Sequence, residues 1–180
     1  MVWIYFKDNP WEEGHRIKRF IWQARVVKGD VWFDMELVTE DVSEKRVIDE
    51  DEVLPTSDWG SAGVWANYHC CTLSTLKWHE GGFNVCKLKD YSPEHLDGLT
   101  LSIDDSPDDL AEEAYDELSF LAYILGHDSV AKHNITFERI GNTDRFNIIW
   151  HGKVALTYMG APEFKYDFST TLNDVLIPRI

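Results

Sequence analysis

The strongest indication of fold is an alternating run of apolar and polar residues over 20–39, with Gly29-Asp30 at its centre. If this dipeptide is a two-residue loop, three apolar pairs meet across a β-hairpin. The predicted pairs are Val26 with Phe33, Ala24 with Met35 and Trp22 with Leu37. Because the opposite face is mixed, the run predicts an antiparallel sheet with one side in water.

Short apolar runs predict further strands elsewhere in the chain. They cover residues 2–7, 68–76, 83–88, 99–104, 135–140, 146–150, 154–158 and 164–168. Turn residues at 141–144 and at 151–153 separate three of these runs, which are therefore expected to form a meander.

One principal helix is predicted from residue 107 to about 125. Ser106 is a suitable cap, and Pro107 suits the first helical position. At 100° per residue, one stripe collects apolar side chains; its members are Leu110, Ala114, Leu118, Leu121 and Leu125. A short final helix is also expected, capped by Ser169 or Thr170 and ended by Pro178.

These elements together predict a single α+β domain over residues 1–180. It consists mainly of an antiparallel sheet of hairpins and a meander, with the 107–125 helix packed on it. With 44% hydrophobic and 13% aromatic residues, the composition excludes an acidic disordered chain.

Two stretches account for the whole formal net charge of −15. Residues 34–52 contain nine acidic and two basic residues, and residues 104–117 contain eight acidic residues and no base. Charge gathered in this way produces a local negative field that a basic partner feels over about 8 Å at physiological salt. Direct binding to nucleic acid is disfavoured by the sign of the charge.

The charge pattern therefore favours an acidic binding protein that docks or neutralises a basic protein, similar in action to an immunity protein or a nucleic-acid mimic. On the predicted helix the partner-binding residues are Asp108, Asp109, Glu112, Glu113, Asp116 and Glu117. In the first acidic stretch they are Asp49, Glu50, Asp51 and Glu52.

A small hydrolase that uses carboxylates and a bound cation is an alternative. No motif assigns a catalytic residue, a cofactor or a metal site, and we expect none. His69, Cys71, His79 and Cys86 are conceivable zinc ligands, but they lack CxxC or HxxxH spacing. Together with Cys70, these cysteines are expected to be reduced thiols.

A second alternative is a module that binds a small ligand or a sugar through exposed indoles. Trp11, Trp59 and Trp65 lie in segments with loop character and are the candidates for such contacts. The first eight residues lack a signal-peptide pattern, and no apolar run is long enough for a membrane span. We therefore expect a cytoplasmic protein that does not bind membranes.

Overall fold

A computed structural model describes residues 2–9, 11–41, 59, 69–76, 81–110 and 112–180. This part of the chain is mainly β structure. Its strands are β1 (Trp3–Phe6), β2 (His15–Val27), β3 (Asp30–Thr39), β4 (Thr72–Ser74), β5 (Phe83–Lys87), β6 (Thr100–Ile103), β7 (Leu121–Tyr123), β8 (His127–Arg139), β9 (Arg145–Leu156) and β10 (Ala161–Leu176). The helical pieces are short: η3 (Leu88–Asp90), α2 (Pro93–Leu96), η4 (Pro107–Asp109), η5 (Glu112–Glu117) and η6 (Thr157–Met159).

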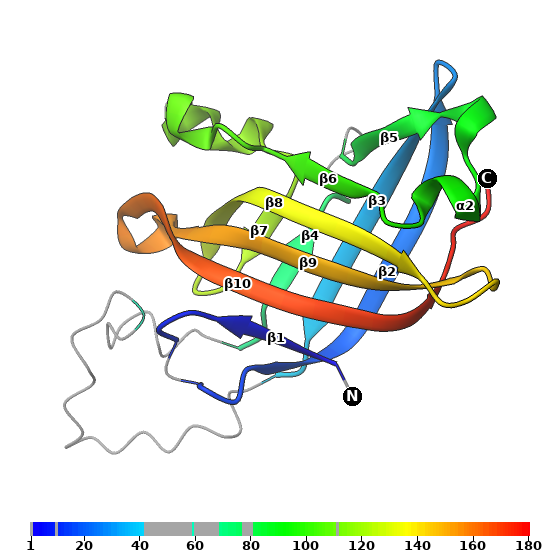
Figure 1. The fold of residues 1–180 in the computed structure, drawn as a ribbon. Coiled ribbons are helices and arrows are strands. Elements are labelled where there is room, and N and C mark those ends of the chain that lie inside the picture. Colours follow the sequence, from blue (N-terminus) through cyan, green and yellow to red (C-terminus); the bar gives the residue numbers. More distant parts are fainter. Residues whose placement is uncertain (1, 10, 42–58, 60–68, 77–80, 111) are drawn as a thin grey trace.

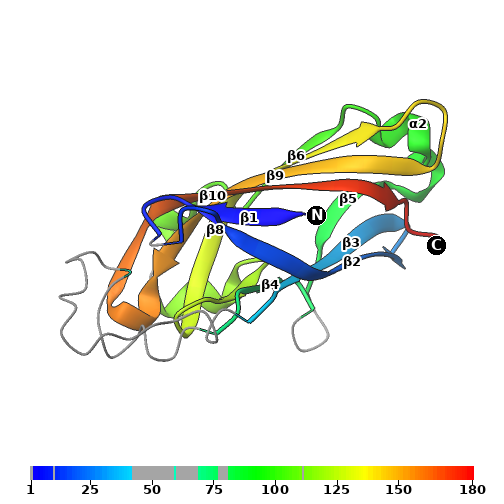
Figure 2. The same ribbon diagram turned by 90° about the horizontal axis from the view of Figure 1, so that it is seen from below.

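All strand pairs are antiparallel, and the sheet closes into a ring. The order is β2-β1-β10-β9-β8-β7-β4-β3, and β3 pairs again with β2. Two short strands lie beside this ring: β5 pairs with β3, and β6 pairs with β8. Figures 1 and 2 show β8, β9 and β10 forming one wall and β2 and β3 forming the opposite wall.

Among the described residues, aromatic side chains pack against one another in the interior of the ring. Trp22 stacks on Phe137 with ring centroids 5.4 Å apart, and Phe33 meets Phe137 edge-on at 5.7 Å. A second group surrounds Trp150, whose ring lies 5.0 Å from that of Phe120. The part of the interior that these side chains occupy has no room for a ligand.

The predicted principal helix is wrong, and with it the α+β class. Residues 107–125 form the 3₁₀ turns η4 and η5 and then the strand β7, which pairs with both β4 and β8. The same residues carry a second pattern of period two, because Leu118, Phe120, Ala122 and Ile124 are all buried. Closing the ring requires this extended pattern, so the tertiary pairing overrides the helical spacing.

The predicted C-terminal helix and the turn at 151–153 are also wrong. β10 continues as a strand to Leu176, with Phe168, Thr170 and Leu172 buried in alternation. β9 runs without a turn through Gly152, where the ring of Phe168 leaves no room for a side chain. The predicted strand 146–150 and residues 154–156 of the predicted strand 154–158 therefore belong to one strand, β9, whereas residues 157 and 158 lie in η6.

The hairpin of β2 and β3 exists, but its predicted register is wrong by two residues. Val26 pairs with Val31, and Ala24 pairs with Phe33. Lys28 and Gly29 make the turn, with φ angles of 53° and 87°. Two consecutive positive φ angles are characteristic of the type I′ turn that suits a hairpin. A shift of two residues keeps the same face inward, so Trp22 and Phe33 are buried as predicted, whereas Val26 is 41% exposed.

The shorter strand predictions are confirmed in β1, β5 and β6. Within 135–140 the prediction covers only part of β8, and in the described part of 68–76 the strand is limited to β4. None of the helices in the described ranges has the length and apolar content needed to cross a membrane.

Candidate functional site

The acidic segment 104–117 leaves the sheet after β6 and returns to it at β7. Figure 1 shows it extending past the end of β6. Asp104 fixes its start: the carboxylate accepts hydrogen bonds from the Ser119 backbone N–H at 2.8 Å and the Ser119 hydroxyl at 3.0 Å. The Asp104 carbonyl accepts a further bond from the backbone N–H of Lys132. Both ends of the segment are thus tied to the ring.

A small hydrophobic cluster of its own holds the segment against the ring. The cluster consists of Leu118, Ala131, Ala155 and Phe164, with Leu110 and Tyr115 packed against it. The Tyr115 ring lies 5.1 Å from that of Phe164, and its hydroxyl donates to the Pro162 carbonyl at 3.3 Å. Because apolar contacts anchor the segment, its acidic side chains project from a folded base rather than from a free tail.

The carboxylates of this segment do not share one α-helix face, because its described residues form short 3₁₀ turns. Asp105, Asp109 and Glu117 are exposed, and none of them has an ion pair with another described residue. Asp108 forms an ion pair with Lys132, and Asp116 is exposed beside a small pocket. Of the remaining predicted residues, Glu112 and Glu113 lie in η5, and their side chains are outside the described part.

The first acidic stretch, 34–52, is partly neutralised by the neighbouring strand. Three of its acids form ion pairs with arginines of β2: Asp34 with Arg25 at 2.9 Å, Glu36 with Arg19 at 2.6 Å, and Glu40 with Arg16 at 3.1 Å. Asp49, Glu50, Asp51 and Glu52 lie outside the described residues. The segment 104–117 is therefore the acidic surface whose geometry is known.

The small pocket beside Asp116 has a volume of about 190 Å³ and also contains Asp128 and His127. Burial raises the pKa of Asp128, although backbone N–H groups oppose the shift. Its carboxylate accepts hydrogen bonds from the backbone of Leu125, Gly126 and Tyr158. Through these bonds the Asp128 carboxylate links two turns of the backbone, so its role is structural.

The conceivable zinc ligands do not come together in the described structure. Cys71 is fully buried, and burial raises the pKa of its thiol. His69 is exposed and lies 3.9 Å from Asp41, whereas His79 is outside the described residues. Across the ranges described, no group of three or more His, Cys, Asp or Glu residues is placed to hold a metal ion.

Of the three tryptophans singled out in the sequence, the two that the structure describes are buried or half-buried. Trp59 is completely buried, with its ring 5.2 Å from that of Tyr166. Trp11 is half-buried against His15, and Trp65 is outside the described residues. The expectation of an exposed indole at Trp59 is therefore wrong.

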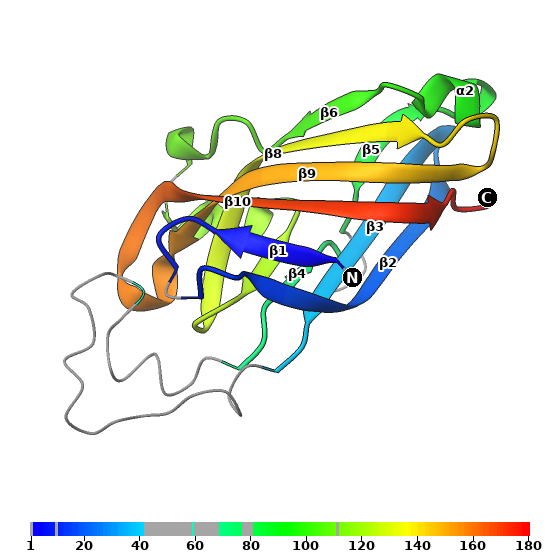
Figure 3. The same cartoon turned by 60° about the horizontal axis from the view of Figure 1, so that its bottom comes forward.

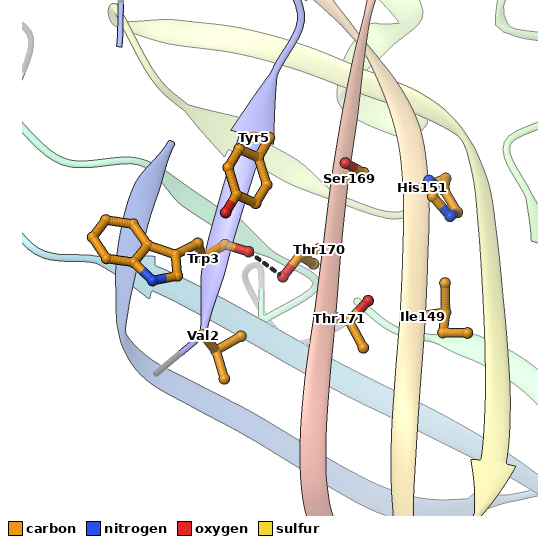
Figure 4. Close-up of a pocket in the computed structure, with 8 residues that line it drawn as sticks. All are labelled: Val2, Trp3, Tyr5, Ile149, His151, Ser169, Thr170 and Thr171. Carbon is orange, nitrogen blue, oxygen red and sulfur yellow. Dashed lines mark hydrogen bonds between the residues drawn. The ribbon is translucent and has the colours of Figure 1, made fainter. Parts of the chain in front are cut away.

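An aromatic groove is present elsewhere, on the outer face of β1, β10 and β9, where sequence reasoning had not placed one. Figure 4 shows Tyr5 on the β1 side, Ser169 and Thr171 on β10 at the base, and His151 on the β9 side, while the indole of Trp3 extends away from β10. The sequence signal was the alternation within β1: Ile4 and Phe6 are buried, so Tyr5 between them faces outward, on the same face as Trp3.

Comparison of the chain with models of protein families, with curated proteins and with solved structures finds no match. A functional argument for this protein therefore rests on its own residues.

Proposed function

We propose that this protein is an acidic binding protein that docks a basic protein partner through the 104–117 segment. The observation that supports the proposal is the combination of exposed carboxylates with a dedicated hydrophobic anchor. Asp105, Asp109 and Glu117 are displayed on a segment that Tyr115 and Leu118 hold against the ring. Acidic groups already held in place lose less conformational entropy on binding than groups on a flexible tail.

The net charge of −15 extends the effect of this surface beyond direct contact. A negative field accelerates the encounter with a positively charged protein and weakens as salt is added. Partners whose natural ligand is a polyanion, such as nucleases and other nucleic-acid-binding proteins, carry the matching positive groove. Carboxylates that occupy such a groove take the place of phosphates and would inhibit the partner.

The proposal includes a cytoplasmic location. Cys70, Cys71 and Cys86 are free, and free thiols are the usual state of cysteines in a reducing compartment.

Affinity capture from the native lysate tests the proposal when the wild type is compared with two charge variants. The first variant is Asp105→Asn/Asp109→Asn/Glu117→Gln. The matched control, Glu12→Gln/Glu13→Gln/Asp144→Asn, changes the net charge equally at other exposed acids. We expect one basic protein to be retained by the wild type and the control, to be lost from the first variant, and to elute in high salt. Equal retention by all three proteins would contradict the proposal.

A further inference from the structure

The outer groove over β10 is independent of the acidic segment, and we propose that it binds a neutral oligosaccharide. It consists of two adjoining hollows with volumes of about 290 and 410 Å³, which share Tyr5, His151 and Ser169. Pockets for small ligands have volumes in this range. Figure 3 shows β10 between β1 and β9, so that both neighbours border the groove.

Strand register creates the groove, because small residues of β10 lie between larger residues of its neighbours. Ser169 pairs with Tyr5 on one side and with His151 on the other. In the next outward-facing row, Thr171 pairs with Ile149 and lies beside Trp3, since the neighbouring Ile4 pairs with Thr170. The base therefore carries hydroxyl groups, and the Tyr5 ring lies on the β1 side.

The aromatic side of the groove is held in position before any ligand binds. The Tyr5 ring lies so close to Gly14 that a Cβ atom there would come within 2.7 Å of it, and Gly14 has a φ of 76° that favours glycine. At the Trp3 end, the Thr170 hydroxyl donates to the Trp3 carbonyl at 2.9 Å (Figure 4). Tyr5 is nevertheless 46% exposed, so its ring remains available for contact.

The polar groups of the groove are available for a ligand. Within the described part of the protein, the side chains of Ser169, Thr171 and His151 have no hydrogen bond to another residue. Hydroxyl and imidazole groups can each donate and accept, as the hydroxyl groups of a sugar do. The apolar C–H face of a sugar ring can pack on the Tyr5 ring, so one ligand class satisfies both the aromatic and the polar groups of the groove.

Charge favours a neutral ligand over an ionic one. One end of the groove is lined by Lys7 and Asp167, and the neighbouring Lys153 donates a hydrogen bond to Asp167 at 2.7 Å. Two cations against one anion disfavour a cationic ligand locally, while the net charge of −15 disfavours an anionic ligand at longer range. From Thr171 to Asp167 the groove follows β10 for roughly 13 Å, which is longer than a single sugar ring requires.

The test is titration of the ¹⁵N-labelled protein with maltotriose, cellotriose and chitotriose, followed by amide NMR shifts. Trigalacturonate serves as the anionic comparison. We expect at least one neutral trisaccharide to saturate shifts centred on Tyr5, Ser169 and Thr171, and to bind more tightly than trigalacturonate. Tyr5→Ala should weaken this binding at least tenfold.

Tyr123→Ala is the matched control, because Tyr123 lies on β7 and is 43% exposed. It should leave the affinity unchanged, which separates loss of the groove from a general effect of removing a surface tyrosine. Three results would overturn the proposal: no saturable binding of the neutral trisaccharides, tighter binding of trigalacturonate, or equal weakening by both tyrosine variants. None of them bears on the acidic segment, so the two proposals fail independently.

Discussion

His133 is a fully buried histidine in the aromatic core. Its ring centroid lies 4.4 Å from that of Phe120, and its Nδ1 accepts a hydrogen bond from Trp150 Nε1 at 3.1 Å. Burial lowers the pKa of His133 to about 3, against a smaller opposing contribution from the Val130 backbone. The neutral imidazole is thus part of the packing, and Nδ1 can accept the Trp150 bond only while it carries no proton.

The low pKa predicts a loss of stability in mild acid. Below about pH 6.5 the unfolded chain binds a proton at His133, whereas the folded chain does not until about pH 3. Stability from the neutral histidine is therefore complete above pH 6.5 and decreases as the pH falls, by about 1.4 kcal/mol per unit. Between pH 7 and pH 5, the free energy of unfolding should decrease by about 2 kcal/mol more in the wild type than in His133→Gln.

Urea unfolding at the two pH values measures this difference. His95→Gln is the control, because His95 is exposed and its removal should leave the pH dependence as in the wild type. If the free energy of unfolding decreases by the same amount in His133→Gln and in the wild type between pH 7 and pH 5, the result contradicts a neutral His133 in the folded core.

Among the secondary-structure elements, the segment 104–123 carries two overlapping sequence patterns, one helical and one extended. Leu110, Leu118 and Leu121 fit a helical stripe, while Leu118, Phe120 and Ala122 fit a strand. Local spacing does not choose between the two patterns. The choice depends on pairing with β8, which follows β7 directly, and with β4, which is distant in sequence; β7 joins the two in the closed ring. Strands flanked by clear turns, such as β1, β5 and β6, were predictable because one pattern was present.

The acidic segment also provides a prediction about local stability. Asp104→Gly removes the carboxylate that accepts two hydrogen bonds from Ser119. Glycine tolerates the φ of 54° at this position, so backbone strain does not contribute. We expect a loss of about 1–3 kcal/mol in the free energy of unfolding and faster amide exchange at Ser119.

Asp105→Gly is the matched control for this change. Asp105 is exposed and has no ion pair among the described residues, so the substitution should cost only the extra backbone freedom of glycine in the unfolded chain, about 0.5–1 kcal/mol. Equal effects of the two substitutions would show that the Asp104 carboxylate does not anchor the segment.

For the whole molecule, the sequence located the acidic charge and placed Arg25 opposite Asp34 on the predicted hairpin, but it did not indicate the ion pairs of Arg16 and Arg19. The two acidic stretches have similar net charges when residues are counted along the chain. In the folded protein, however, acids of the stretch 34–52 form ion pairs with Arg16, Arg19 and Arg25 of β2. Such cross-strand pairing depends on the register of β2 and β3, and the predicted register was wrong by two residues. The groove was missed for a related reason, because it exists only where β1, β10 and β9 lie side by side.

The association rate of the captured partner tests the proposed docking most directly. Stopped-flow measurements at low and physiological salt would compare the wild type, the Asp105→Asn/Asp109→Asn/Glu117→Gln variant and the Glu12→Gln/Glu13→Gln/Asp144→Asn control. Because steering depends on local charge, the first variant should associate about tenfold more slowly at low salt, with a weaker salt dependence, and the control should stay close to the wild type. Identical rates and salt dependences for the two variants would contradict docking through the 104–117 segment.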